Sequence, residues 1–147
     1  MKIVIDTNVI IDGIKDDYSY EKQILDAVIS GEIEAYANHG TLSENKLIMN
    51  QLLNDESYKS EMHALFGQIN MVRNRHHIRV VRDPEDNKIL ESAVESGADY
   101  LVTRDNDLLS IGNYENVNIV TPAEFWNKYK DEGGDLWKQW TGFFGGK

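Results

Sequence analysis

Four carboxylates are the side chains of this chain whose type and spacing best fit catalysis. Asp6 directly follows a short apolar run, Lys2 to Ile5, and Asp105 follows another such run. Glu44 and Asp86 stand near the starts of two segments with helical apolar spacing. Each acid alone has an ordinary structural explanation, because such residues cap helices, complete capping boxes or form polar turns. A cleft that held all four together would have no such explanation.

Carboxylates gathered in one cleft would repel one another, and the pKa of some of them would rise. A hard divalent cation removes this repulsion, and all-oxygen ligands suit Mg²⁺ or Mn²⁺. Two such cations about 3.5–4 Å apart could activate a water and stabilise the leaving oxygen of a phosphodiester. The chain has no cysteine, which excludes disulfides, thiolate metal sites and cysteine nucleophiles. His76 and His77 would face opposite ways in a strand, so we expect solvent exposure rather than a shared metal.

The apolar pattern predicts strands that alternate with helices. The predicted strands are Lys2–Ile5, Ile33–Ala37, Ile78–Val81, Asp99–Val102 and Val117–Val120. The predicted helices are Tyr20–Ser30, Thr41–Leu53, Glu56–Val72, one from Pro84 to Gly97, a short one after Asp105, and a last one from Thr121. This alternation predicts an α/β fold, a three-layer α/β/α sandwich around a parallel sheet of about five strands. Strand ends and the first turns of the following helices then share one edge of the sheet, where we expect all four acids.

Two of the acids also continue an apolar stripe on their own helices. Glu44 lies four residues before Ile48, and Asp86 lies four residues before Leu90. This spacing places both on the inward faces of their helices. For Glu44 a capping box with Thr41 is the alternative explanation.

Residues 71–82 carry four arginines and two histidines in a chain with a net charge of −10. Two interpretations remain open: the arginines contact phosphates, or they keep an edge strand from pairing with other chains. The overall acidity argues against nonspecific nucleic-acid binding, which depends on lysine and arginine. It leaves open a nuclease whose carboxylates hold metal ions.

The 147 residues predict a single domain. No apolar run approaches the roughly 18 residues of a membrane span, and a strand followed by Asp6 is not the pattern of a signal peptide. We therefore expect a cytoplasmic protein without a membrane partner. No glycine-rich phosphate loop is present, so nucleotide cofactors are not expected.

The segments VIDTNVI, RDPEDNKILESA and ADYLVTRDNDLL, with Glu44 between the first two, resemble the PIN-domain nucleases. The resemblance runs from Lys2 to about Phe125 and is strongest to the VapC-like toxin components of prokaryotic toxin–antitoxin pairs. It implies a PIN-like fold and an endoribonuclease that depends on Mg²⁺ or Mn²⁺. By motif position, it implies that the catalytic and metal-binding residues are Asp6, Glu44, Asp86 and Asp105.

The resemblance also implies supporting residues. Thr7, Asn8 and Thr103 match positions that support the site by hydrogen bonding, and Asp107 is a possible fifth acid. Arg104 stands where the family motif usually has glycine. An arginine there could contact a phosphate of the substrate or simply be exposed.

The aromatic end of the chain suggests a separate segment. All three tryptophans lie from Trp126 onward, and Gly133-Gly134 suggests a break. We therefore divide the chain into a PIN-like nuclease domain, 1–130, and an aromatic extension, 131–147. The extension either packs on its own domain or forms an interface with a second copy in a homodimer or with an antitoxin protein.

Three other classes of function compete with an RNA-cutting enzyme. A catalytically silent PIN-fold binding module would have no reason to keep four clustered acids. A haloacid-dehalogenase-type phosphohydrolase needs a second Asp two residues after Asp6, where this chain has Asn8. A response-regulator domain would carry a conspicuous lysine near the last strand and would lack the arrangement at Asp105.

Overall fold

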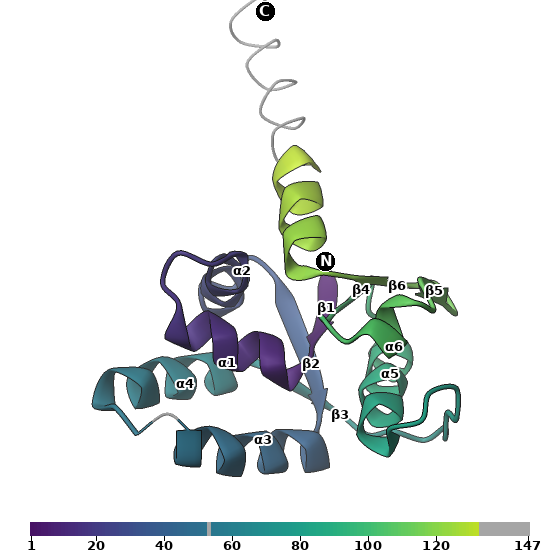
Figure 1. Ribbon diagram of the computed structural model, residues 1–147, viewed down its shortest axis with the longest axis horizontal. Coiled ribbons are helices and arrows are strands. Elements are labelled where there is room, and N and C mark those ends of the chain that lie inside the picture. The colour runs from purple at the N-terminus through teal and green to yellow at the C-terminus, as the bar shows by residue number, and fades with distance from the viewer. Residues whose placement is uncertain (53, 133–147) are drawn as a thin grey trace, which may run out of the picture.

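A mostly parallel sheet of six strands crosses the computed structural model, which describes residues 1–52 and 54–132 (Figure 1). The strands are β1 (Lys2–Ile5), β2 (Glu34–Asn38), β3 (Asn70–Val72), β4 (Tyr100–Val102), β5 (Asn113–Tyr114) and β6 (Val117–Val120). Their order across the sheet is β3-β2-β1-β4-β6-β5, and β5 pairs antiparallel with β6 while the other pairs are parallel. The predicted parallel α/β architecture is confirmed, with one short antiparallel strand added at an edge.

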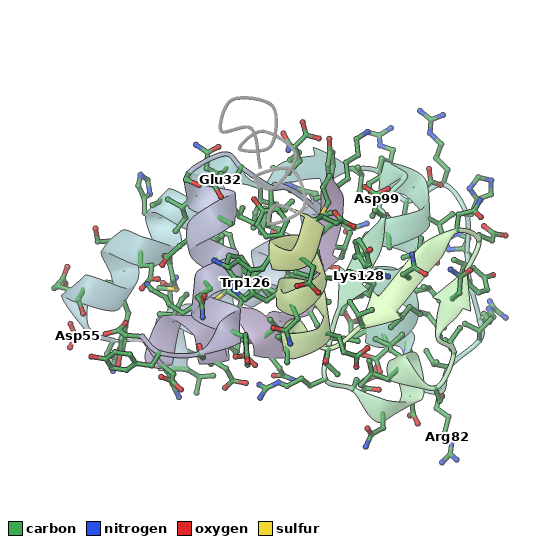
Figure 2. All side chains as sticks on the ribbon, turned by 90° about the horizontal axis from the view of Figure 1, so that it is seen from above. Glu32, Asp55, Arg82, Asp99, Trp126 and Lys128 are labelled. Atoms are coloured by element: carbon green, nitrogen blue, oxygen red, sulfur yellow. The ribbon has the colours of Figure 1, made fainter. Side chains whose placement is uncertain are left out.

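Helices cover both faces of this sheet (Figure 1). They are α1 (Thr7–Lys15), α2 (Tyr20–Ile29), α3 (His39–Leu52), α4 (Glu56–Gln68), α5 (Pro84–Ser96) and α6 (Asn106–Leu109), and residues 122–132 are also helical. Figure 2 labels Trp126 and Lys128 on this last helix, where the Trp126 ring lies 5.3 Å from that of Tyr129. Among the described residues, no helix is both long and apolar enough to cross a membrane.

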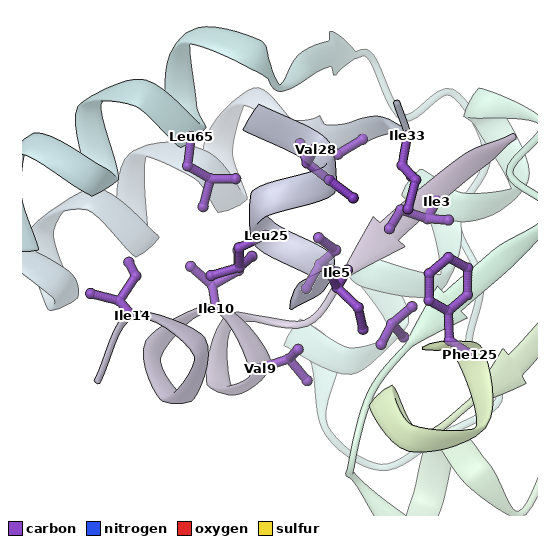
Figure 3. Packing of buried hydrophobic residues seen from close by; sticks show 14 of the residues in the cluster. Ile3, Ile5, Val9, Ile10, Ile14, Leu25, Val28, Ile33, Leu65 and Phe125 are labelled. Atoms are coloured by element: carbon purple, nitrogen blue, oxygen red, sulfur yellow. The ribbon is translucent and has the colours of Figure 1, made fainter. Parts of the chain in front are cut away.

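Strand β1 is buried on both faces, as its uninterrupted apolar sequence predicts. Ile3 and Ile5 belong to a core cluster with α1, α2 and the helix at 122–132, part of which is seen in Figure 3. Val4 points into a second cluster with residues of α5 such as Leu90. Alternate side chains of one strand therefore join the two helical layers.

The carboxyl ends of β1 and β4 lie side by side. Ile5 pairs with Val102, and the backbone N–H of Asp6 donates to the carbonyl of Val102 at 3.0 Å. Thr103 in turn donates its backbone N–H to the carbonyl of Val120 at 3.0 Å. The residues that follow these two strands, Asp6 and 103–105, are thereby brought to one edge of the sheet.

The helix predicted over 56–72 is too long. α4 ends at Gln68, and Asn70–Val72 forms β3, which pairs with β2 through Tyr36 and Asn70. The helical apolar spacing continued past the true end because Ile69 and Val72 happen to fit it. Only pairing with a strand from elsewhere in the chain shows where the helix ends.

The strand predicted at Ile78–Val81 is also wrong. The backbone N–H of Ile78 donates to the carboxylate of Glu91 at 3.0 Å. Those of Val80 and Val81 donate to Oδ1 of Asn87 at 3.0 and 3.1 Å. Side chains of α5 therefore occupy the backbone donors that a neighbouring strand would need.

The apolar spacing predicts Ile48, Met49, Leu52 and Leu53 on the buried face of α3, which is confirmed at Met49 but wrong at Ile48 and Leu52. Ile48 is 43% exposed and Leu52 is 53% exposed, whereas Leu42, Asn45 and Met49 are buried. A pattern of apolar residues alone does not reveal the buried stripe of α3, because Asn45 in its middle is polar. Leu53, predicted on the same face, lies outside the described residues.

The ends of other helices follow the predicted chemistry. Asp83 caps α5 and accepts from the backbone N–H of Glu85 at 2.9 Å, with Pro84 in the first turn and Gly97 at φ 66° after the last. Thr121 accepts from the backbone N–H of Glu124 at 3.2 Å, as its predicted capping box requires.

Candidate active site

Asp6 stands between the end of β1 and the start of α1 and is only 7% exposed. The Thr103 hydroxyl donates to its Oδ2 at 2.8 Å. Burial raises the pKa of Asp6, and the negative charge of Asp105 raises it further. The Thr103 hydroxyl and the backbone amides of Thr7 and Asn8 act in the opposite direction. The balance leaves a carboxyl group that ionises less readily than an exposed one.

Thr103 connects the ends of β1 and β4. Its side chain is fully buried, and its hydroxyl donates to Asp6 while accepting from the backbone N–H of Asp105 at 3.0 Å. A single hydroxyl therefore fixes the Asp6 carboxylate against the backbone of Asp105. This placement is the one expected of a supporting residue.

Asp105 caps α6. Its Oδ1 accepts from the backbone N–H groups of Asp107 at 2.8 Å and Leu108 at 3.2 Å. These bonds hold the carboxylate in one orientation while using only one of its two oxygens. The cap and a role in a metal site are therefore compatible.

Asp86 lies in the first turn of α5 and is 8% exposed. Its pKa is raised to about 6. Burial is the largest cause, and the negative charges of nearby acids also raise it: Asp105, Asp83, Asp6 and Asp107. Because the charges of Asp6 and Asp105 each raise the pKa of Asp86, three of the four predicted acids lie in one region at this edge of the sheet. We call Asp6, Asp86 and Asp105 the carboxylate cluster.

Glu44 does not join the carboxylate cluster. Its side chain is exposed on α3 and lines a neighbouring cleft. There the charge of Glu44 raises the pKa of Lys88, although the hydrogen bond and the charge of Glu85 raise it more. Because Ile48 and Leu52 are exposed as well, the spacing that suggested an inward Glu44 describes the outer face of the helix.

The other predicted residues surround the cluster at different depths. The Thr7 hydroxyl donates to Oδ1 of Asn45 at 2.7 Å, which connects α1 to α3. Asn8 is exposed beside Asp6, and Asp107 is exposed on α6. Sequence reasoning missed Asn45, although a polar residue between Leu42 and Met49 at helical spacing was a usable signal.

A cleft of about 510 Å³ opens beside Asp6 and Asp105, and Asn8, Asp12 and Arg104 also line it. Arg104 forms an ion pair with Asp12 of α1, and its Nη1 lies 3.7 Å from Oε1 of Glu21 on α2. The guanidinium at the cleft is therefore held by two carboxylates, although the Arg104 side chain is 46% exposed. A phosphate that reached it would compete with these acids.

Comparison with known proteins agrees with this arrangement. Residues 2–107, which include the carboxylate cluster and Glu44, match the family model of the PIN domain. The chain belongs to the PIN-domain family. PIN domains are generally metal-dependent nucleases, so the family indicates a nuclease role. A PIN-domain assignment also fits the sheet order and the placement of acids at its carboxyl edge.

One relative is an uncharacterized protein of Methanocaldococcus jannaschii, 29% identical over 144 residues. The match spans 88% of this chain and 92% of the relative, so the similarity extends beyond the PIN-domain match. No solved structure matches the chain.

The carboxylate cluster suits a hard divalent cation in its chemistry. Its donors are all oxygen, and burial together with the charge of Asp105 raises the pKa of both Asp6 and Asp86. Within the described residues, however, no three histidine or acidic side chains stand close enough to hold one ion together. The donor set therefore fits the metal, and its side chains would have to close around it.

Proposed function

We propose that this PIN-domain protein is an endoribonuclease that depends on Mg²⁺ or Mn²⁺ and hydrolyses RNA phosphodiester bonds. The observation that carries the proposal is the convergence of Asp6, Asp86 and Asp105 from β1, α5 and the end of β4. Burying Asp6 and Asp86 where the charge of Asp105 acts on both costs free energy. Such an arrangement is expected where a cation and a phosphate are to be bound.

In this proposal Asp6, Asp86 and Asp105 hold the cation. When bound, a Mg²⁺ or Mn²⁺ ion would activate a water molecule and offset the charge on the phosphate. Thr103 fixes the Asp6 carboxylate, and the α6 cap fixes that of Asp105. The reaction adds water across one P–O bond, which leaves a phosphate on one fragment and a hydroxyl on the other.

We propose Glu44, which lines the neighbouring cleft, as the fourth acid of the site. Its role is tested separately, because it lies apart from the other three. A Glu44→Gln protein that keeps full activity would restrict the site to the carboxylate cluster.

The experiment is cleavage of a labelled single-stranded RNA with Mn²⁺, with Mg²⁺ and with EDTA. We expect cutting with either metal and none with EDTA, and a loss of at least 100-fold in Asp86→Asn. Glu85→Gln is the matched control, because it removes one charge from the same helical turn at an exposed position. Equal activity of wild type and Asp86→Asn would contradict the proposal.

A catalytically silent binding module is the second candidate. The separation of Glu44 from the cluster favours it, as does the lack of a closed three-donor group among the described residues. Calorimetry with Mn²⁺ separates the two candidates. A protein that neither cuts RNA nor binds the metal would be such a module.

We further propose that the enzyme acts in the cytoplasm as the toxin of a toxin–antitoxin pair, as the VapC-like motifs suggest. Its partners would then be the RNA substrate, an antitoxin protein and a second copy in a homodimer. The aromatic extension predicted to form such an interface lies outside the described residues from 133 onward. Expression should arrest growth, Asp86→Asn should not, and light scattering of the purified chain should report a dimer.

A further inference from the structure

A second cleft, of about 630 Å³, lies between the start of α3 and the chain that leads into α5. Its lining includes Asn38, Glu44, His77, Arg79, Arg82 and Lys88. We call this feature the basic cleft. It contains two of the four arginines that the sequence concentrates in residues 71–82.

Buried side chains of α5 fix the wall that carries these arginines. Asn87 accepts from the backbone N–H groups of Val80 and Val81, and its Nδ2 donates to the carbonyl of Val81 at 2.9 Å. The Glu91 carboxylate binds the backbone N–H of Ile78 at 3.0 Å. The segment is therefore held in place although it is not a strand. Side chains of α5 hold it by binding its backbone groups.

The arginine side chains themselves remain available. In the part of the chain that the structure describes, neither Arg79 nor Arg82 forms an ion pair. Figure 2 shows Arg82 extending outward from the edge of the molecule. Arg104 is different, because it is paired with Asp12 and Glu21. Exposed guanidinium groups that stay unpaired in a chain of net charge −10 are suited to an anion from outside.

Three positive and two negative side chains line the basic cleft. Arg79, Arg82 and Lys88 contribute positive charge, and Lys88 lies 3.0 Å from Glu85. Glu44 and Glu91 contribute negative charge, and Glu91 is already bound to the segment that carries the arginines. The two arginines are therefore the groups best placed for an incoming phosphate.

The first turns of α5 connect the basic cleft to the carboxylate cluster. Asp86 belongs to the cluster, whereas Pro84, Asn87 and Lys88 line the basic cleft. An extended polyanion bound at the cluster would reach the arginines by following the first turns of α5. Guanidinium groups bind phosphate oxygens through paired hydrogen bonds, which makes arginine well suited to this contact.

We propose that the basic cleft binds backbone phosphates of single-stranded RNA next to the bond that is cut, with Arg79 and Arg82 as the main contacts. This inference rests on the proposed ribonuclease function and names where its substrate lies. It also assigns the arginine-rich segment to phosphate contact rather than to protection of an edge strand. Arg79 and Arg82 flank no strand, since residues 78–81 do not pair with the sheet, and it is Arg73 that follows the edge strand β3.

The test measures binding apart from cleavage. A fluorescently labelled single-stranded RNA is titrated with the full chain in EDTA at several salt concentrations, and affinity is read from anisotropy. We expect Arg79→Ala with Arg82→Ala to bind about tenfold more weakly, and the slope of log K against log salt to become shallower by about 1.4. Lysine at both positions should restore part of the affinity, because lysine keeps the positive charge but lacks the paired N–H donors of a guanidinium.

The matched control is Arg73→Ala with Arg75→Ala, which removes the same charge from the same segment outside the cleft. It should leave the affinity within about twofold of wild type. Equal weakening by both double variants, or no weakening by either, would overturn the inference. Competition by poly-glutamate as strong as that by RNA would also overturn it, because the cleft would then suit an acidic protein.

Cleavage with Mn²⁺, measured on the same proteins, separates this inference from the proposed function. A wild type that binds RNA through Arg79 and Arg82 but never cuts it would refute the nuclease and support the phosphate site. A wild type that cuts RNA, and an alanine double variant that binds and cuts equally well, would refute only the phosphate site.

Discussion

Asp86 is the residue at which proton binding and folding are most strongly coupled. Its pKa is about 6 in the folded protein, against 3.8 for an unperturbed aspartate, chiefly because it is buried. Between these values the folded state binds more protons than the unfolded state, so stability falls as the pH rises. The unfavourable contribution is absent below about pH 3.8 and complete above about pH 6.

Asp86→Asn should therefore stabilise the metal-free protein at pH 8 by about 1–2 kcal/mol, after allowance for solvent screening. The gain at pH 3 should be close to zero, since both states are then largely protonated at this position. Urea unfolding in EDTA at the two pH values measures the difference, with Glu85→Gln as the control at an exposed site. An equal gain at both pH values would contradict the coupling.

The hydroxyls of Thr7 and Thr41 should respond in opposite ways to replacement by valine. The Thr7 hydroxyl donates to Asn45, which is itself buried, so Thr7→Val should cost about 1–2 kcal/mol of unfolding free energy. The Thr41 hydroxyl is buried without a hydrogen-bond partner among the described residues. Thr41→Val should therefore be neutral or stabilising by up to about 1 kcal/mol. Urea unfolding of both variants checks this, and equal losses would show that Thr41 has a partner.

At the scale of single elements, α5 both presents Asp86 and holds the arginine-rich segment. Asn87 makes three hydrogen bonds to the backbone of Val80 and Val81, and its side chain is buried. Asn87→Ala should cost about 2–3 kcal/mol and speed amide exchange at both valines, because their N–H groups lose their acceptor. Lys88→Ala is the control from the same helix. Unchanged exchange at Val80 and Val81 would show that other contacts hold the segment.

Elements with strong local signals could be predicted from the sequence. β1 and β4 are short apolar runs that end at polar residues, and α5 carries its own start and stop in Asp83-Pro84 and Gly97. β3 could not be predicted, because an edge strand depends on pairing with β2 rather than on its own residues. The segment 78–81 resembles a strand in composition, but side chains of α5 satisfy its backbone.

In the candidate site, too, some residues could be predicted from local sequence signals and others depend on contacts elsewhere in the fold. Asp6, Thr103 and Asp105 follow strands whose positions the sequence determines locally, and the structure brings them together as predicted. Glu44 depends on how α3 is rotated, which is decided by a buried stripe that includes Asn45. A pattern based on apolar residues alone cannot resolve that rotation.

At the scale of the whole molecule, the chain combines a net charge of −10 with acids gathered at one edge of its sheet. A cation that binds the carboxylate cluster in the folded protein alone would stabilise the whole domain by mass action. It would also relieve the repulsion that raises the pKa of Asp86. Metal binding and thermal stability should therefore be coupled through this one edge.

We expect Mn²⁺ at about 100 times its dissociation constant to stabilise the protein by about 2.7 kcal/mol, which corresponds to a Tm increase of roughly 5–10 °C. Differential scanning fluorimetry measures it, with NaCl at matched ionic strength to account for general screening of an acidic protein. In Asp86→Asn the starting Tm should be higher at pH 8 and the increase with Mn²⁺ should largely disappear, because a ligand and its charge are lost together. An increase of the same size in Asp86→Asn and wild type would place the bound metal elsewhere on the acidic surface, and the carboxylate cluster would lose its role.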